Sequence, residues 1–129
     1  MNGKAYPMVA HLVHRSAEGK LAVVAVLFTE GKGRPVLGRL IQRFPDEEGK
    51  EVAPEGVTVD ASALLPGTRG YYTFTGSLTT PPCSEGVTWF VLKSPVPLSA
   101  TATAAFARRY PNNARPVQPL NGRTVQMTP

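Results

Sequence analysis

Two histidines, His11 and His14, are the only imidazoles in the chain, and they lie three residues apart. On a helix this spacing would bring the two rings together, whereas on a strand it points them to opposite faces. The alternation around Val9 and Val13 is typical of a strand, so we expect His11 to share a face with these two valines. A zinc site needs three or four ligands, and the two histidines are not expected to bind one metal ion. A hydrogen-bonded core histidine is the plainer interpretation.

A second group of candidates lies in the segment SLTTPPC, residues 77–83. Thr79 and Thr80 precede two consecutive prolines, which supply no N–H donor and exclude an ordinary strand ladder. A hydroxyl beside such a rigid loop could orient a bound water or substrate, and ordinary loop threonines are the alternative. Cys83 is the only cysteine, so an internal disulfide is excluded. On its own it is most simply a small apolar residue of the core.

The strand-like segment that follows adds apolar and acidic candidates. Val87 and Trp89 share a strand face and could line an apolar pocket, or they could simply belong to the core. Glu85 is the only acid nearby and could pair with a backbone amide or an arginine. A catalytic triad can be assembled from His14, Ser77 and Glu85, but no nucleophile elbow surrounds this serine. We therefore do not favour a triad.

Hydrophobic periodicity predicts the elements that would position these residues. β-Branched and apolar runs predict strands at residues 9–13, 21–28, 70–76, 87–92 and 123–125. The run at 21–28, LAVVAVLF, is expected to be buried on both faces. Helical spacing predicts helices at 36–44 and at 99–110, with Ser99 as a cap, while Asp60 could cap a turn to residue 65 and loops are expected at 29–35 and 45–56. This pattern predicts an α+β domain with a mixed or antiparallel sheet.

Composition narrows the class of protein. The 129 residues fit one domain, and 13 prolines and 12 glycines favour turns and loops over a helical bundle. The net charge is +5, but the densest basic group (Arg108, Arg109 and Arg115) has no aromatic ladder beside it, so nucleic-acid binding is not expected. No run is long enough to span a membrane. The first residues have no signal-peptide core, which predicts a cytoplasmic location if Met1 is the true start.

Four segments resemble the α-class carbonic anhydrases. YPMVAHLVH (6–14) resembles the strand that carries that family's third zinc histidine, and LAVV (21–24) resembles the next strand. GSLTTPPCSEGVTW (76–89) is similar to the family's most distinctive segment, and NNARPVQPLNGR (112–123) to its C-terminal signature. The resemblance covers almost the whole chain but only about the C-terminal half of a typical family domain. It implies a mainly β fold, with a large twisted, mostly antiparallel sheet and short peripheral helices.

The resemblance also implies roles for single residues. His11 looks like the third zinc ligand, and Thr79 like the residue whose hydroxyl accepts a hydrogen bond from zinc-bound hydroxide and whose amide faces the substrate oxygen. Thr80 would lie beside the bicarbonate site. The residues that resemble the apolar wall for carbon dioxide are Val13, Val23, Leu78, Val87 and Trp89. The family's reaction is the reversible hydration of carbon dioxide to bicarbonate by zinc-bound hydroxide.

The sequence departs from the family pattern around the metal. The family's other two zinc histidines form a His-x-His pair, which is missing here, as are the acid that partners the orienting threonine and the histidine proton shuttle. Val9 replaces a glutamate that usually hydrogen-bonds the third zinc histidine, and losing such a carboxylate typically costs about 10–100-fold. Ala25 replaces a common glycine, which is a mild change. Cys83 matches a cysteine that pairs near the N-terminus in secreted members, so a periplasmic or secreted origin is implied.

Three explanations follow from these departures. We expect residues 1–129 to be a partial α-carbonic anhydrase domain without its N-terminal half, with little bound zinc and little turnover. The alternatives are a non-catalytic binding or structural module, and a chain that pairs with another polypeptide to restore a zinc site. The expected small-molecule partners are carbon dioxide and bicarbonate, with no nucleic acid and no membrane. Exposed sheet edges predict self-association.

Overall fold

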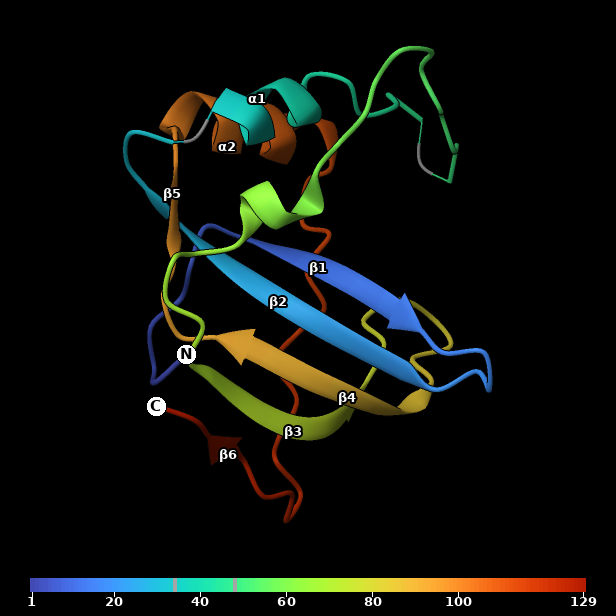
Figure 1. Cartoon of the computed structure of the whole chain (residues 1–129), viewed down its shortest axis with the longest axis vertical. Helices are drawn as coiled ribbons and strands as arrows, with labels where there is room; N and C mark the ends of the chain where they lie inside the picture. Colours follow the sequence, from blue (N-terminus) through green and yellow to red (C-terminus); the bar gives the residue numbers. More distant parts are fainter. Residues whose placement is uncertain (34, 48) are drawn as a thin grey trace.

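The computed structural model describes residues 1–33, 35–47 and 49–129. Within these residues, six strands form one sheet, and the helices gather beyond one end of it (Figure 1). The strands are β1 (Met8–Arg15), β2 (Leu21–Glu30), β3 (Tyr71–Ser77), β4 (Glu85–Leu92), β5 (Val96–Leu98) and β6 (Gln126–Met127). The helices are α1 (Pro35–Ile41), α2 (Ala100–Arg109) and the short 3-10 helix η1 (Ala61–Leu64). None of the described helices is long and apolar enough to cross a membrane.

The sheet is mixed, and most of its pairs are antiparallel. Its order is β1-β2-β4-β3-β6, with β5 paired to the end of β2. The pairs β1–β2, β3–β4 and β3–β6 are antiparallel, whereas β4 and β5 run parallel to β2. The parallel β2–β4 pair follows from the long connection between them, which contains α1, η1 and β3. This arrangement confirms the predicted mainly β fold with short peripheral helices.

Strand β2 separates two apolar clusters. Val26 and Phe28 belong to the larger cluster, which the helices cover through Leu37, Ile41 and Ala102. The smaller cluster consists of four buried residues: Val23, Ala25, Val87 and Trp89. Because successive side chains of a strand point to opposite faces, the continuous apolar run of β2 is explained by a cluster on each side. The prediction that this strand is buried on both faces is confirmed.

The helix boundaries follow local chemistry. Pro35 starts α1, where its missing N–H and fixed φ suit the first turn. The Ser99 hydroxyl accepts a hydrogen bond from the Ala102 amide at 3.2 Å, and the Asp60 carboxylate accepts one from the Ser62 amide at 2.9 Å. Both predicted caps are therefore confirmed. Helix α1 ends at Ile41, before the predicted residue 44.

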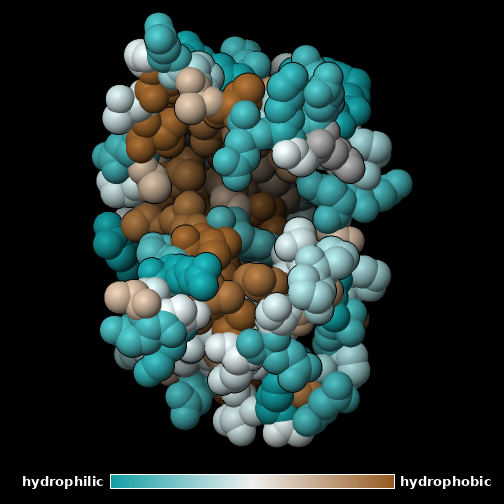
Figure 2. Space-filling view, turned by 90° about the vertical axis from the view of Figure 1, so that its right-hand side faces the viewer, coloured by the Kyte–Doolittle hydropathy of each residue, from teal (hydrophilic) through white to brown (hydrophobic). Residues whose placement is uncertain are grey.

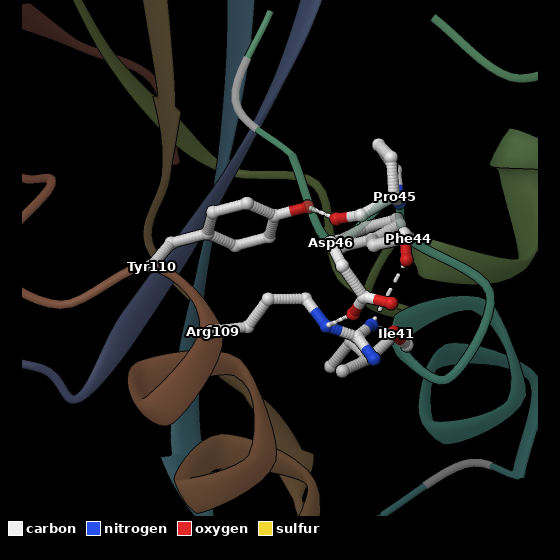
Figure 3. Close-up of polar contacts among 6 residues, drawn as sticks. All are labelled: Ile41, Phe44, Pro45, Asp46, Arg109 and Tyr110. Carbon is white, nitrogen blue, oxygen red and sulfur yellow. Dashed lines mark hydrogen bonds and ion pairs between the residues drawn. The ribbon is translucent and has the colours of Figure 1, made fainter. Parts of the chain in front are cut away.

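Hydrogen bonds and an ion pair join the end of α2 to the end of α1 and the segment that follows it (Figure 3). Arg109 Nη1 donates to the carbonyls of Ile41 and Phe44, each at 3.0 Å, and its Nε pairs with the Asp46 carboxylate at 2.9 Å. The Tyr110 hydroxyl donates to the Pro45 carbonyl. The Ile41 carbonyl, at the end of α1, also accepts a hydrogen bond from the Phe44 amide at 3.3 Å. Arg109 therefore adds a charged donor to the last carbonyl of α1 and supplies one to the Phe44 carbonyl beyond it.

Two strand predictions differ from the structure. The strand predicted at 123–125 is wrong in position, since β6 comprises Gln126–Met127 and pairs with Tyr72 and Thr73. Strand β5 was not expected because Pro97 lies at its centre. Proline is tolerated there because β5 pairs only with β2 among the described strands. The predicted loops at 29–35 and 45–56 include Arg34 and Glu48, which lie outside the described residues.

Candidate active site

Strand β1 presents His11 on an open face of the sheet. Val9 and Val13 lie on the same face and are 38% and 58% exposed, and His11 is also exposed. Ala10 and Leu12 point the other way and pack against the larger cluster. The alternation predicted from the sequence is therefore confirmed, and His11 and His14 point to opposite faces.

The pairing register brings the expected apolar wall together beside His11. Val13 lies opposite Val23, Val23 lies beside Trp89, and Trp89 lies opposite Phe74. Strand partners in register share a face, so these four residues form one row across the sheet. The sequence-predicted wall residues occupy one connected surface: Val23 and Val87 are buried in the smaller cluster with Trp89, and Leu78 packs against it.

Trp89 is the centre of this surface. Its ring meets the His11 ring edge-on, with centroids 4.9 Å apart and planes at 84°, and lies parallel to the Phe74 ring at 6.3 Å. The indole Nε1 donates to the Ser77 carbonyl at 3.0 Å. A side chain on Gly76 would have its Cβ 3.0 Å from Trp89 Cδ1, so any larger residue there would push against the indole. The indole is thus fixed beside the imidazole.

Partial removal of water around His11 alters its chemistry. Burial against neighbouring groups lowers the pKa of the His11 imidazole from its ordinary value of 6.5, although the residue keeps an exposed edge. Desolvation disfavours the charged form of a histidine. The lowered pKa favours the neutral form of the ring, which is the form that can donate a lone pair to a metal ion.

The predicted threonine loop connects β3 to β4 and is held by two hydrogen bonds between its own residues. The Leu78 amide donates to the Ser84 carbonyl at 2.9 Å, and the Cys83 amide donates to the Thr80 carbonyl at 2.8 Å. Thr79 is half-buried and Thr80 is exposed. No hydrogen bond joins either threonine hydroxyl to another residue in the described part of the chain, so both remain available. Leu78 anchors the start of the loop on the apolar wall.

Sequence reasoning missed Arg115 as a neighbour of this loop. It grouped Arg115 with Arg108 and Arg109, but those two residues lie on α2, and Arg109 is engaged with the segment after α1. Arg115 Nη1 instead donates to Ser77 Oγ at 2.8 Å. The only sequence signal was its place in the NNARPVQPLNGR segment, because its partner lies 38 residues away.

The described residues do not make a metal site by themselves. Among residues 1–33, 35–47 and 49–129, no group of three or more histidine, cysteine, aspartate or glutamate side chains is close enough to hold a metal ion. The neighbours of His11 on its face are Val9 and Val13 along the strand and Ala25 and Trp89 across it, and none of these can be a ligand. A single imidazole does not fit the three protein ligands of a catalytic zinc site.

The exposed part of the site is strand β1, where Val9, His11 and Val13 reach solvent, whereas Val23, Val87 and Trp89 are buried. Figure 2 shows apolar side chains gathered in a band with a hollow on one side of the molecule. A hollow of about 260 Å³ between α1 and residues 56–59 is lined by Val36, Arg39, Leu40 and Arg43 among others. None of the candidate residues predicted from the sequence lines this hollow.

This sheet, with a histidine edge-on to a tryptophan and a proline-bounded threonine loop, is part of the fold of the α-carbonic anhydrases. The α-carbonic anhydrase of Thermovibrio ammonificans, solved with the inhibitor sulfanilamide, superposes with a TM-score of 0.88 at 45% identity over 96% of this chain and 55% of that chain. The enzyme of Photobacterium profundum gives 0.87 at 46% identity, over 95% and 56%. Dioscorin, solved in complex with ascorbate, gives 0.74 at 32% identity, over 98% and 55%.

The chain belongs to the eukaryotic-type carbonic anhydrase family, whose family model matches residues 1–129. A carbonic anhydrase of Nostoc sp. is 44% identical over 125 residues, which are 97% of this chain and 47% of that protein. A carbonic anhydrase of Klebsiella pneumoniae is 48% identical over 126 residues, covering 97% and 51%. The chain spans about half the length of the curated relatives it matches.

Proposed function

We propose that this chain forms part of a carbonic anhydrase active site, and that the whole protein catalyses the reversible hydration of carbon dioxide to bicarbonate. The observation that carries this proposal is the His11 imidazole, which lies edge-on to Trp89 on the face that also bears Val13 and Val23, and whose pKa is lowered by burial. An apolar wall beside a ligand histidine suits a small apolar substrate, because polar groups there would retain water. Membership of the family supports the same reaction.

In this proposal each candidate residue has a distinct role. His11 is one zinc ligand, Thr79 orients the attacking oxygen, and Thr80 lies beside bicarbonate. The proposed wall for carbon dioxide consists of Val13, Val23, Leu78, Val87 and Trp89. The place of Thr79 in the chain supports these roles, because Thr79 directly follows Leu78, which packs against the apolar wall.

The proposal requires further metal ligands from residues outside this chain. One imidazole is too few for a catalytic zinc site, and the described residues contain no group of three or more possible ligands. We therefore propose that residues 1–129 are a partial domain, with negligible zinc binding and turnover when alone. The share of the relatives' length that the chain covers, about half, supports this interpretation.

The open edge of β1 supports a second part of the proposal, which is self-association of the isolated chain. Among the described strands β1 pairs with β2 alone, so one row of its backbone groups has no strand partner. The exposed valines Val9 and Val13 add apolar surface beside that edge. Such an edge is a template for pairing with another chain. A chain that remains a monodisperse monomer as its concentration is raised would contradict this part.

The test of the function is zinc stoichiometry measured together with carbon dioxide hydration. For the purified chain we expect no stoichiometric zinc and negligible turnover. The nucleotide sequence upstream of the Met1 codon is a further test, because an in-frame His-x-His segment there would supply the missing ligands. If a longer protein with those ligands bound zinc but did not hydrate carbon dioxide, the proposed reaction would be refuted.

A non-catalytic binding module is the alternative. It is favoured by the likeness to dioscorin, which was solved in complex with ascorbate, and by the single histidine on the open face. The two functions are separated by the same measurements. A longer protein without zinc but with a tightly bound small molecule on the open face would favour the binding module.

A further inference from the structure

Arg115 is unusual within its segment. All other residues from 111 to 122 are exposed, whereas Arg115 is half-buried and turns toward the loop between β3 and β4. Neither ion pair of the described residues includes Arg115. An arginine that is withdrawn from water without a carboxylate partner needs another acceptor, and that acceptor is the hydroxyl of Ser77.

A chain of hydrogen bonds leads from Arg115 to the threonine loop. Arg115 Nη1 donates to Ser77 Oγ at 2.8 Å, and Ser77 Oγ donates in turn to the Leu78 carbonyl at 3.0 Å. The directions are consistent, because a serine hydroxyl has one donor and two acceptor positions while a guanidinium only donates. Trp89 Nε1 holds the neighbouring Ser77 carbonyl at 3.0 Å. Ser77 is therefore held through both its side chain and its backbone.

The last acceptor in this chain sets the direction of a backbone donor. The Leu78 carbonyl and the Thr79 N–H belong to one peptide group, which is planar and trans, so the two bonds point in opposite directions. Fixing the carbonyl toward Ser77 Oγ thus fixes the Thr79 N–H on the other side. In the described part of the chain this N–H has no acceptor. Hydrogen bonds in series also polarise one another, which strengthens the final donor.

We propose that Arg115 is a positioning residue that acts through Ser77 to orient and polarise the Thr79 N–H as a donor to a substrate oxygen. This inference rests on the proposed function for its substrate, an oxygen of carbon dioxide or bicarbonate. A fixed donor aimed at the place where negative charge develops stabilises an anion without reorganisation. The positive charge of Arg115 contributes through the hydrogen bonds and does not touch the substrate.

The test is hydrogen exchange of the full chain by mass spectrometry, read without metal or substrate. The Leu78 and Cys83 amides are the hydrogen-bonded reporters within the loop. A hydrogen bond from a charged group has an effect of roughly tenfold to a hundredfold on such an equilibrium. In Arg115→Met we expect the segment 78–84 to exchange at least tenfold faster, while β2 and β4 keep their protection. Arg115→Lys, which retains a donor, should restore most of the protection.

Two further variants complete the design. Ser77→Ala should speed the exchange of segment 78–84 as much as Arg115→Met does. The double variant should exchange no faster than either single variant, because both changes break the same series of hydrogen bonds. The matched control is Arg108→Met, since Arg108 is exposed and has no partner among the described residues. Arg108→Met should leave the exchange rate of segment 78–84 unchanged.

Several results would overturn the inference. These are unchanged exchange of segment 78–84 in Arg115→Met, equal loss of protection in β2 and β4, failure of Arg115→Lys to rescue, and a wild-type loop without protection. None of these results would bear on the proposed hydration of carbon dioxide by the longer protein. Failure of the longer protein to hydrate carbon dioxide would refute the reaction with the exchange results unaltered, so the two failures are distinguishable.

Discussion

Replacing Trp89 with phenylalanine should destabilise the fold by an amount that can be worked from its contacts. Trp89 is 7% exposed, packs on His11 and Phe74, and donates its indole N–H to the Ser77 carbonyl. Phenylalanine keeps an aromatic ring but removes the donor, which costs about 1–3 kcal/mol when the acceptor is not exposed. The smaller ring leaves a space that adds about 1 kcal/mol. The expected loss is roughly 2–4 kcal/mol in the free energy of unfolding.

The assay is urea unfolding followed by far-ultraviolet circular dichroism at low protein concentration. Circular dichroism is required because Trp89 is the only tryptophan and its fluorescence is lost with the substitution. The control is Tyr72→Phe, which removes a hydroxyl whose partner is an exposed asparagine at 3.4 Å. The control should lie within about 0.5 kcal/mol of the parent chain. A Trp89→Phe loss as small as that of the control would refute the description of Trp89 as the fixed centre of the wall.

Two other predictions concern the titration of His11 and the attachment of α2. Because burial lowers the pKa of His11, the unfolded state binds more protons just below pH 6.5, so stability should fall as the pH drops through 6.5 toward the folded pKa. Proton NMR of the two histidines should show His11 titrating below 6.5, with His14→Gln assigning the signals; a His11 pKa above 6.5 would contradict this. Arg109→Met should cost about 2–3 kcal/mol in urea unfolding, because the Ile41 carbonyl loses a charged donor. Asp46→Asn should cost less than about 1 kcal/mol because that carboxylate is 85% exposed. Equal losses of unfolding free energy in Arg109→Met and Asp46→Asn would contradict the prediction that the bond to the Ile41 carbonyl matters more than the ion pair.

Local patterns predicted the parts of the fold that local chemistry determines. The run LAVVAVLF predicted a strand buried on both faces, and the structure places clusters on each side of β2. The caps at Ser99 and Asp60 depend on residues two or three positions away, and both were predicted correctly. Strand β5 could not be predicted in this way, because three residues with a central proline become a strand only through pairing with β2.

The site could be predicted only in part from residue types and spacing. The alternation of β1 predicted the shared face of His11 and Val13, but the roles of these residues came from the resemblance to carbonic anhydrases. Composition alone gave no reason to prefer a catalytic histidine to a core histidine. The contact of Arg115 with Ser77 was missed because the two residues are 38 positions apart, and no periodicity reports a pairing of that length.

The number of metal ligands is the central claim, and zinc content tests it most directly. After incubation with zinc and removal of the free ion, the purified chain should retain far less than one equivalent by elemental analysis, because the described residues contain no group of three or more side chains that could hold a metal ion. His11→Ala should then leave the retained metal unchanged. One equivalent of zinc that is lost in His11→Ala would contradict the account, since it would show that this chain completes the metal site with its own side chains.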